Sequence, residues 1–514
     1  MSGLPCSGRS AYASLSADHQ ILMFDAHDIA VLVRSGSPLI VIETSEERLL
    51  LDAFRRVVGE LFRPLWQWSI TNGLKRLDLD DDESPPCNDS SQALEWMYRH
   101  PQRGIWLLFD FSPYLRYASN LRRLREVALG QASAGQCVVL VGSKVEVPDE
   151  LADLVTRFEM RLPDESTLMK LLREEAFAYS REHSGRRVEV ESAAQRALIR
   201  HLLGLSLIDA RKIVRQLIYA DGKIGEHDVR EAQRAKFALL GRDGILHFEP
   251  DASEFAEVAG LSKLKHWIGQ RKALFVDGKP PKGLDPPRGV LLLGVQGCGK
   301  SLAAKAIAGG FGVPLLRLDF GALYNKYHGE TERNLREALK TAEAMSPCVL
   351  WCDEIEKGLA TSNSDDGVSR RVLGFLLTWM AERKRPVFLV ATANAVDQLP
   401  PEFLRKGRFD EIFFVDLPSE TAREEAFRIH FKRRELLAEQ FDLPALVAAS
   451  QGFSGAEIEQ AIVSALYEAY AAERPLQQSQ LLAALRATRP LSVLMAEKVQ
   501  WLRDWARERC VAAD

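Results

Sequence analysis

The feature that most constrains the fold of this 514-residue chain is an internal repeat. Residues 157–177 read RFEMRLPDESTLMKLLREEAF, and from Arg408 the chain reads RFDEIFFVDLPSETAREEAF. Other stretches match in the same order: IWLLFDF (105–111) with VLWCDEI (349–355), CVVLVGSK (137–144) with VFLVATAN (387–394), and GLSLIDARKIVRQLIYA (204–220) with GFSGAEIEQAIVSALYEAY (452–470). Ordered matches that lie 243 to 255 residues apart predict two tandem copies of one module.

Each copy alternates short strands rich in Val, Ile and Leu with amphipathic helical stretches. This pattern predicts an α/β fold with a parallel sheet covered on both faces. We expect an N-terminal tail at 1–24, a first α/β module at 25–164, a helical lid-like segment at 165–240, a second α/β core at 250–418 and a C-terminal helical region at 419–514.

Composition excludes several classes of protein. The net charge of -4, from 67 basic and 71 acidic residues, gives no global attraction to nucleic acid or to an anionic membrane. No apolar run approaches the ~20 residues of a membrane-spanning helix, and the N-terminal residues lack the pattern of a secretory signal. The seven cysteines are scattered, which indicates thiols in a reducing cytoplasm.

The second copy contains GVQGCGKS (294–301) between the apolar stretch GVLLLG and the helix-like LAAKAIAGG. It fits G-x4-G-K-[ST], a pattern whose glycines let backbone N–H groups turn towards phosphate. Lys300 is expected to reach the β and γ phosphates, and the Ser301 hydroxyl to bind Mg²⁺. We therefore predict a site for ATP and Mg²⁺. Its expected nucleotide-binding residues are Gly294, Gly297, Cys298, Gly299, Lys300, Ser301 and Leu302.

Catalytic residues are predicted further along the second copy. The apolar strand CVLWC ends in Asp353, expected to hold Mg²⁺ through water, and Glu354, expected to polarise the attacking water. Asn394 follows the next apolar strand and is expected to orient that water. Arg405 and Arg408 lie three apart on a polar turn, where they are expected to stabilise the transferring phosphoryl group in a neighbouring subunit. The alternative for this turn is a solvated basic loop.

Taken in order, these motifs resemble those of the AAA ATPases. The resemblance covers 250–480 and includes FAEVAGLSKLK (255–265), LYNKYHGETERNLREAL (323–339), VSRRVLGFLLTWM (368–380) and ATANAVDQLPPEFLRKGRFD (391–410). It implies tandem P-loop NTPase-like AAA modules, Val258 and Ala259 bordering adenine, and Gly455 and Ala456 of a helical lid closing over the nucleotide. It also implies a homohexamer.

Across the whole chain, the resemblance narrows to the plastid, cyanobacterial and bacterial AAA proteins of the Ycf type. Those proteins carry a degenerate front module and a PLS element, here TRPLSVLMAEKVQWLRDWA (488–506). The phosphate loop departs from the AAA pattern, because Val295 and Gln296 replace two prolines and Cys298 replaces a threonine. We expect nucleotide binding to survive these changes. A reactive Cys298 would make binding sensitive to oxidation, and the alternative is a small residue that simply fits.

The first copy lacks this catalytic set. Where the phosphate loop should be it reads IETSEERLL (42–50), with no glycine run, no lysine, and glutamates that would repel phosphate. Matched by its letters, Asp110 corresponds to Asp353 and Phe111 to Glu354, while Asn394 corresponds to Ser143 or Lys144. Arg157 corresponds to Arg408, and we expect it to belong to a structural ion pair, the alternative being an arginine that acts on a neighbouring site. Leu154 corresponds to Arg405. We predict that the first module binds no ATP and serves as docking surface, spacer or ring-forming partner.

The residues Lys326, Tyr327, His328 and Gly329 follow the second strand of the second copy. The AAA resemblance implies that this segment lines a central pore and grips an unfolded polypeptide through the exposed Tyr327. The alternative is a tyrosine packed at the start of the next helix.

Two function classes follow. The first is a ring-shaped Mg²⁺-ATPase that remodels a protein client. The second is an ATP-dependent regulatory switch or scaffold. Nucleic-acid remodelling is disfavoured because no basic stripe interleaved with aromatic residues occurs, and no membrane insertion is expected. The client and the pathway do not follow from the sequence.

Overall fold

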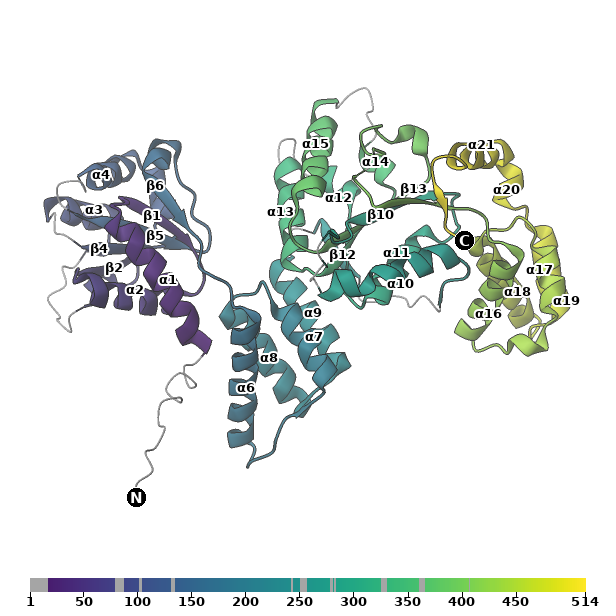
Figure 1. The fold of residues 1–514 in the computed structure, drawn as a ribbon, viewed down its shortest axis with the longest axis horizontal. Coiled ribbons are helices and arrows are strands. Elements are labelled where there is room, and N and C mark those ends of the chain that lie inside the picture. The colour runs from purple at the N-terminus through teal and green to yellow at the C-terminus, as the bar shows by residue number, and fades with distance from the viewer. Residues whose placement is uncertain are drawn as a thin grey trace, which may run out of the picture. The chain divides into compact units, whose positions relative to one another are not determined.

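The computed structural model describes residues 17–78, 87–100, 104–130, 135–241, 244–249, 257–277, 281, 283–324, 331–359, 366–405 and 407–514. The chain divides into two compact units, 1–228 and 229–514. Each unit contains one large sheet with helices against it and a separate group of helices (Figure 1).

The sheet of the first unit has the strand order β3-β2-β4-β5-β1-β6. Its strands are β1 (Leu39–Glu43), β2 (Leu65–Ser69), β3 (Gly73–Arg76), β4 (Ile105–Phe109), β5 (Cys137–Gly142) and β6 (Val155–Phe158). The central strands β4 and β5 are buried along their whole length and consist almost entirely of aliphatic and aromatic residues. Among the described strands of this sheet, only β3 runs antiparallel to its neighbour, so the sheet is parallel at its core.

Helices cover both faces of this sheet. Ile40 and Ile42 of β1 pack with α1 (Ala17–Arg34) and α2 (Glu47–Leu61), whereas Leu39 and Val41 pack with α3 (Ser90–Arg99) and α4 (Ala118–Leu129). The remaining elements of this unit are the short helices η1 (Ser112–Arg116) and η2 (Asp149–Leu154), the helices α6 (Glu165–Glu182), α7 (Ser192–Leu202) and α8 (Leu207–Asp221), and the paired strands β7 (Glu189–Val190) and β8 (Lys223–Ile224). Helix α9 (Glu226–Leu240) begins at the end of the first unit and lies mostly in the second.

The sheet of the second unit has the order β15-β14-β10-β13-β12-β11-β9. Its strands are β9 (Leu246–Glu249), β10 (Gly289–Gly294), β11 (Leu315–Leu318), β12 (Cys348–Cys352), β13 (Val387–Ala393), β14 (Glu411–Val415) and β15 (Val511–Ala512). The five strands β11-β12-β13-β10-β14 repeat the order of β2-β4-β5-β1-β6 in the first unit. The two sheets therefore share one parallel topology, and this confirms the predicted tandem α/β fold.

Helices α10 (Ser262–Asp277) and α11 (Lys300–Phe311) pack on one face of the second sheet, and α13 (Thr331–Ala344) and α15 (Asp366–Glu382) on the other. Two short helices, α12 (Phe320–Tyr324) and α14 (Ile355–Leu359), follow β11 and β12, and η4 (Val396–Gln398) follows β13. The C-terminal helices are α16 (Glu420–Arg433), η5 (Ala438–Gln440), α17 (Leu443–Ala449), α18 (Gly455–Ala471), α19 (Gln478–Ala487), α20 (Leu491–Leu494) and α21 (Ala496–Ala506).

Helices α16 to α19 form a lid with its own apolar core, built around Phe427, Phe431 and Ile462. Helix α18 begins with a capping box, in which Ser454 and Glu457 each bond the backbone of the other. Within the described residues, no helix is long and apolar enough to cross a membrane.

Candidate active site

The predicted phosphate loop lies between the end of β10 and the start of α11. Gly297 and Gly299 adopt φ angles of 78° and 87°, a left-handed conformation that side-chain-bearing residues rarely take. Gly299 is the N-cap of the twelve-residue helix α11, so the first backbone N–H groups of that helix face the loop. This arrangement suits an anion such as phosphate.

The Lys300 side chain is 6% exposed and folds back onto the same loop. Its Nζ donates hydrogen bonds to the carbonyl oxygens of Gly294 at 2.9 Å and Val295 at 2.8 Å. Burial lowers the pKa of Lys300 to about 8. The charge of Lys300 is therefore held inside the loop by two neutral carbonyl groups, at the point where a phosphate would be bound.

Asp353, Ser301 and Thr392 form a connected set of oxygen atoms beside this loop. Oδ1 of Asp353 accepts a hydrogen bond from Ser301 Oγ at 3.2 Å and one from Thr392 Oγ1 at 2.6 Å. A hydroxyl and a carboxylate are the hard oxygen ligands that Mg²⁺ prefers, and Mg²⁺ usually takes only one or two protein ligands beside phosphates and water. The residues present therefore fit a Mg²⁺ ion bound together with a nucleotide.

Glu354 lies at a sharp turn directly after Asp353. Its φ of 46° is unusual for a residue with a side chain, and its backbone N–H donates to Thr392 Oγ1 at 3.0 Å. Its Oε1 accepts a hydrogen bond from Asn394 Nδ2 at 2.9 Å, and its other oxygen pairs with Lys357. The structure thus brings Glu354 and Asn394, predicted from separate strands, into direct contact.

A pocket of about 300 Å³ opens between the phosphate loop and the lid. Most of the predicted nucleotide-binding residues line it: Val258, Ala259, Gly297, Cys298, Gly299, Leu302, Gly455 and Ala456. The backbone N–H of Ala456, at the start of α18, donates to the carbonyl of Gly297 at 3.3 Å. The lid therefore contacts the phosphate loop directly.

Comparison with known proteins decides the family. The model of the ATPase family associated with various cellular activities (AAA) matches residues 290–417, and the N-terminal and second domains of SpoVK-like AAA ATPases match 25–160 and 166–243. The chain is 35% identical to the uncharacterised AAA domain-containing protein ycf46 of Guillardia theta, over 95% of this chain and 96% of the relative. A protein of the same name from Trieres chinensis is 34% identical, over 93% of this chain and 96% of its own length. This chain belongs to the AAA ATPase family.

Part of the chain is also similar to a more distant relative. The proteasome-activating nucleotidase of Aeropyrum pernix is 39% identical over 194 residues, which cover 36% of this chain and 47% of the relative. The predicted resemblance to AAA ATPases of the Ycf type is confirmed by these matches. The protein is an ATPase, and its second module carries the P-loop of that family.

The AAA lid contributes residues that the sequence motifs did not indicate. Ile429, His430 and Arg433 of α16 line the pocket of about 300 Å³ together with Glu459 of α18 and Glu257. Arg433 pairs with Glu257 at 3.3 Å, which ties α16 to the segment that precedes α10. Burial holds the pKa of His430 below its ordinary value. A motif search misses these residues because only the packing of the lid brings them to the pocket.

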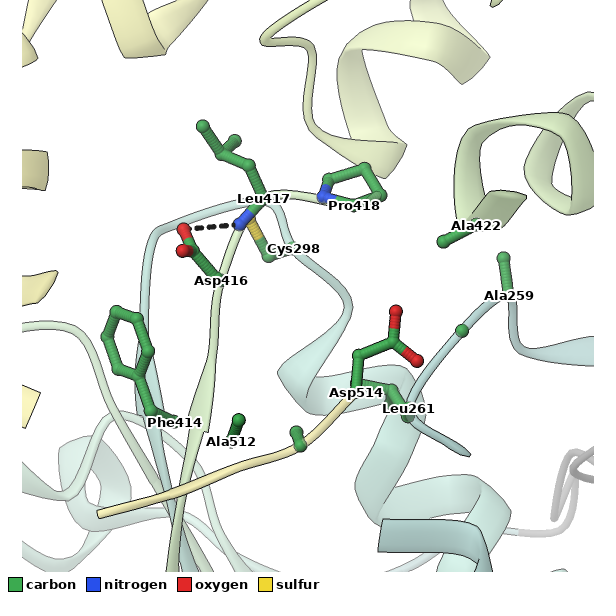
Figure 2. Close-up of a pocket in the computed structure, with 12 residues that line it drawn as sticks. Ala259, Leu261, Cys298, Phe414, Asp416, Leu417, Pro418, Ala422, Ala512 and Asp514 are labelled. Carbon is green, nitrogen blue, oxygen red and sulfur yellow. Dashed lines mark hydrogen bonds between the residues drawn. The ribbon is translucent and has the colours of Figure 1, made fainter. Parts of the chain in front are cut away.

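Cys298 lines both the pocket of about 300 Å³ and a smaller pocket of about 170 Å³. Figure 2 shows Cys298 next to Asp416 and Leu417 at one side of the smaller pocket and Asp514 at the other. Burial raises the pKa of the Cys298 thiol to about 12. Because the thiolate is the reactive form, this shift favours the alternative in which Cys298 is a small residue that fits the loop.

The two predicted arginines differ in their surroundings. Arg408 is half-buried, and its Nη1 donates to the carbonyl oxygen of Leu377 in α15 at 2.6 Å. Arg405 is exposed. The predicted pore residues Lys326, Tyr327, His328 and Gly329 lie outside the described residues.

Strand registers correct the matching of the two AAA-like modules at the site. Leu65 pairs with Ile105 in the first sheet, and Leu315 pairs with Val349 in the second. Aligning Leu65 with Leu315, the first residues of β2 and β11, therefore matches Ile105 with Val349. Counting on along the strands, buried Phe109 takes the position of Asp353, and exposed Asp110 takes that of Glu354. Asp110 also shares the left-handed backbone of Glu354, with a φ of 49°. The prediction that Asp110 matches Asp353 and Phe111 matches Glu354 is therefore wrong by one residue.

The predicted match of Arg157 with Arg408 is also wrong. Arg157 lies inside β6, opposite Val41, whereas Arg408 precedes β14. Ile40 and Val290 correspond, because each faces the helix that follows its strand, α2 or α11. Thr156 lies opposite Ile40 and Glu411 opposite Val290, so β6 and β14 match at an offset of 255 residues rather than 251. The shared letters R-F are displaced by four residues because the segment before the strand differs in length. Arg157 pairs with Glu43 at 3.3 Å, in agreement with the predicted structural role.

Proposed function

We propose that the second module hydrolyses ATP with Mg²⁺, and that it does so within an oligomeric ring. The observation that supports this most strongly is the continuous set of hydrogen bonds from Ser301 through Asp353 and Thr392 to Glu354, and from there to Asn394. A protein that only bound ATP as a signal would need the phosphate loop but not this set.

In this proposal Lys300 binds the β and γ phosphates, and its Nζ exchanges the carbonyls of Gly294 and Val295 for phosphate oxygens. Ser301 and Asp353 would hold Mg²⁺, which, when bound, neutralises charge on the phosphates. Glu354 accepts the proton of the attacking water, and Asn394 orients that water. Val258, Ala259, Gly455 and Ala456 enclose the adenine side of the nucleotide.

Arg405 and Arg408 are proposed to complete the site of a neighbouring subunit. A guanidinium placed next to the γ phosphate stabilises the charge of the transition state. The exposure of Arg405 supports this function. Since such a site requires a neighbour, the working form is an oligomer, and family membership makes a homohexamer the first expectation.

We further propose that hydrolysis drives remodelling of a protein client through the segment that contains Lys326, Tyr327, His328 and Gly329. The similarity of the core to a proteasome-activating nucleotidase supports a protein client rather than a nucleic acid. The alternative is a switch or scaffold in which ATP controls assembly and little threading occurs. The free cysteines among the described residues agree with a reducing, cytoplasmic setting.

The first module is proposed to bind no ATP. Its β1 and α2 are joined by three residues, where five residues join β10 to α11. Phe109 replaces the carboxylate expected to hold Mg²⁺. We propose that this module acts through contacts with other molecules or subunits, as docking surface, spacer or ring-forming partner.

ATP turnover per subunit, measured as protein concentration is raised, tests the proposal. We expect specific activity to increase with concentration and to be lost in Glu354→Gln. An unfolded model protein such as carboxymethylated lactalbumin should stimulate turnover, and Tyr327→Ala should abolish that stimulation. ATP binding without turnover at any concentration would favour the switch or scaffold.

A further inference from the structure

We infer that Thr392 is a positioning residue for ATP hydrolysis, whose hydroxyl sets Asp353 and Glu354 in their working orientations. This inference rests on the functions proposed above for those two carboxylates. Thr392 lies in β13, where it is the one polar residue of a strand that reads VFLVATA and is buried throughout. It is 1% exposed. A buried hydroxyl is costly unless its hydrogen-bonding capacity is used.

The Thr392 hydroxyl both accepts and donates a hydrogen bond, and its partners determine which bond it accepts and which it donates. The backbone N–H of Glu354 can only donate, so Thr392 Oγ1 accepts that bond, at 3.0 Å. The hydroxyl hydrogen is then available for Asp353 Oδ1, at 2.6 Å. A single oxygen atom thus contacts the side chain of one carboxylate residue and the backbone of the next.

These two contacts lie where the parallel strands separate. The last paired residues of β12 and β13 are Cys352 and Ala391, so Thr392 is the next residue beyond that pair. There the chain turns at Glu354 into a left-handed conformation, with a φ of 46°. The turn directs the Asp353 side chain towards Ser301 and that of Glu354 towards Asn394. The Thr392 hydroxyl holds both residues of this turn.

The first module shows that the fold alone does not require this hydroxyl. Strand registers place Val141 at the position of Thr392 and Asp110 at that of Glu354. Asp110 makes the same left-handed turn, but its N–H donates to the backbone carbonyl of Val141 at 2.8 Å. A valine therefore supports this turn in a module that lacks the catalytic set. The hydroxyl is present in the module that retains it.

The test compares Thr392→Val, Thr392→Ser and Glu354→Gln in the full-length protein. Thr392→Val keeps the size of the side chain, and Val141 shows that this position tolerates valine. We expect kcat to fall by about 10- to 100-fold in Thr392→Val, the range found for residues that support metal ligands. Thr392→Ser, which keeps the hydroxyl, should stay within about 3-fold of the wild type. Thr378→Val, at an exposed threonine of α15, is the matched control and should leave kcat unchanged.

A binding measurement separates positioning from general damage. Titration calorimetry with ATP, in EDTA and in Mg²⁺, gives the gain in affinity that Mg²⁺ provides. Thr392→Val should reduce this gain by about 10-fold or more and leave the affinity in EDTA unchanged. If Thr392→Val kept the kcat of the wild type and the same gain in affinity from Mg²⁺, while Glu354→Gln was inactive, the inference would be overturned and the proposed function would stand. Equal loss in Thr392→Ser and Thr392→Val would also overturn it, because the hydroxyl would then not matter. An active Glu354→Gln would instead refute the proposed function.

Discussion

The first module contains a carboxylate where the second has its phosphate loop, and this leads to a specific prediction. Glu46 is 6% exposed, and its Oε1 accepts the backbone N–H of Ile208 at 3.1 Å. Ile208 is the second residue of α8, the helix that corresponds to α18 of the lid. In the second module the matching N–H, that of Ala456, donates to the loop carbonyl of Gly297. The Glu46 carboxylate, just after β1, thus holds the start of α8 against the sheet of the first module.

Glu46→Ala should weaken this link by about 2 kcal/mol, since a hydrogen bond to a charged group contributes roughly 1.5–3 kcal/mol. If opening of the start of α8 limits exchange, the Ile208 amide should exchange hydrogen about 30-fold faster. Hydrogen–deuterium exchange of a peptide that covers residues 206–214 measures this change. Glu47→Ala, at the exposed neighbour in the same turn, should change exchange by less than about 5-fold. Unchanged exchange in Glu46→Ala, or protection of this peptide by ATP, would show that Glu46 does not hold α8 in this way.

Three further predictions concern single side chains. Because burial raises the pKa of Cys298 to about 12, iodoacetamide at pH 7.5 should label it at least 10-fold more slowly than free cysteine, and mild peroxide should leave ATP binding intact. Burial also raises the pKa of Asp25 to about 6 from 3.8, so its charge costs stability at pH 8, by at most about 3 kcal/mol, and this cost shrinks as pH falls from about 6 towards 3.8. Asp25→Asn should therefore raise the melting temperature most at pH 8, less at pH 5, and hardly at all below pH 4. Arg408→Ala should lower the melting temperature because Arg408 bonds Leu377, whereas Arg405→Ala should abolish turnover without changing stability.

The fold was largely predictable because repeated patterns encode it. Short apolar strands that alternate with amphipathic helices define a parallel sheet, and their repetition predicts a second one. The relative register of the two copies was not predictable from the letters alone. Letter matching pairs Asp110 and Arg157 with the wrong residues, because a difference of one to four residues in a connecting segment shifts the register while the apolar pattern still looks alike.

The predictability of the site depends on where its residues lie. The phosphate loop, Asp353, Glu354 and Asn394 follow strands at one edge of a parallel sheet, so their order along the chain predicts that they meet. The sequence does not mark Thr392 as a functional residue, because threonine is common in strands for its branched shape alone. The pocket residues of α16 depend on how the lid packs, and no local pattern in the sequence specifies that packing.

In the proposed ATPase site, an arginine from a neighbouring subunit completes the catalytic set. Mixing two inactive variants tests this arrangement. Glu354→Gln lacks the proposed base but keeps Arg405, and Arg405→Ala lacks the arginine but keeps Glu354. Each variant alone should be inactive, and mixed oligomers should regain measurable ATP turnover. Mixed oligomers that form and stay inactive, or an Arg405→Ala variant as active as the wild type, would contradict it.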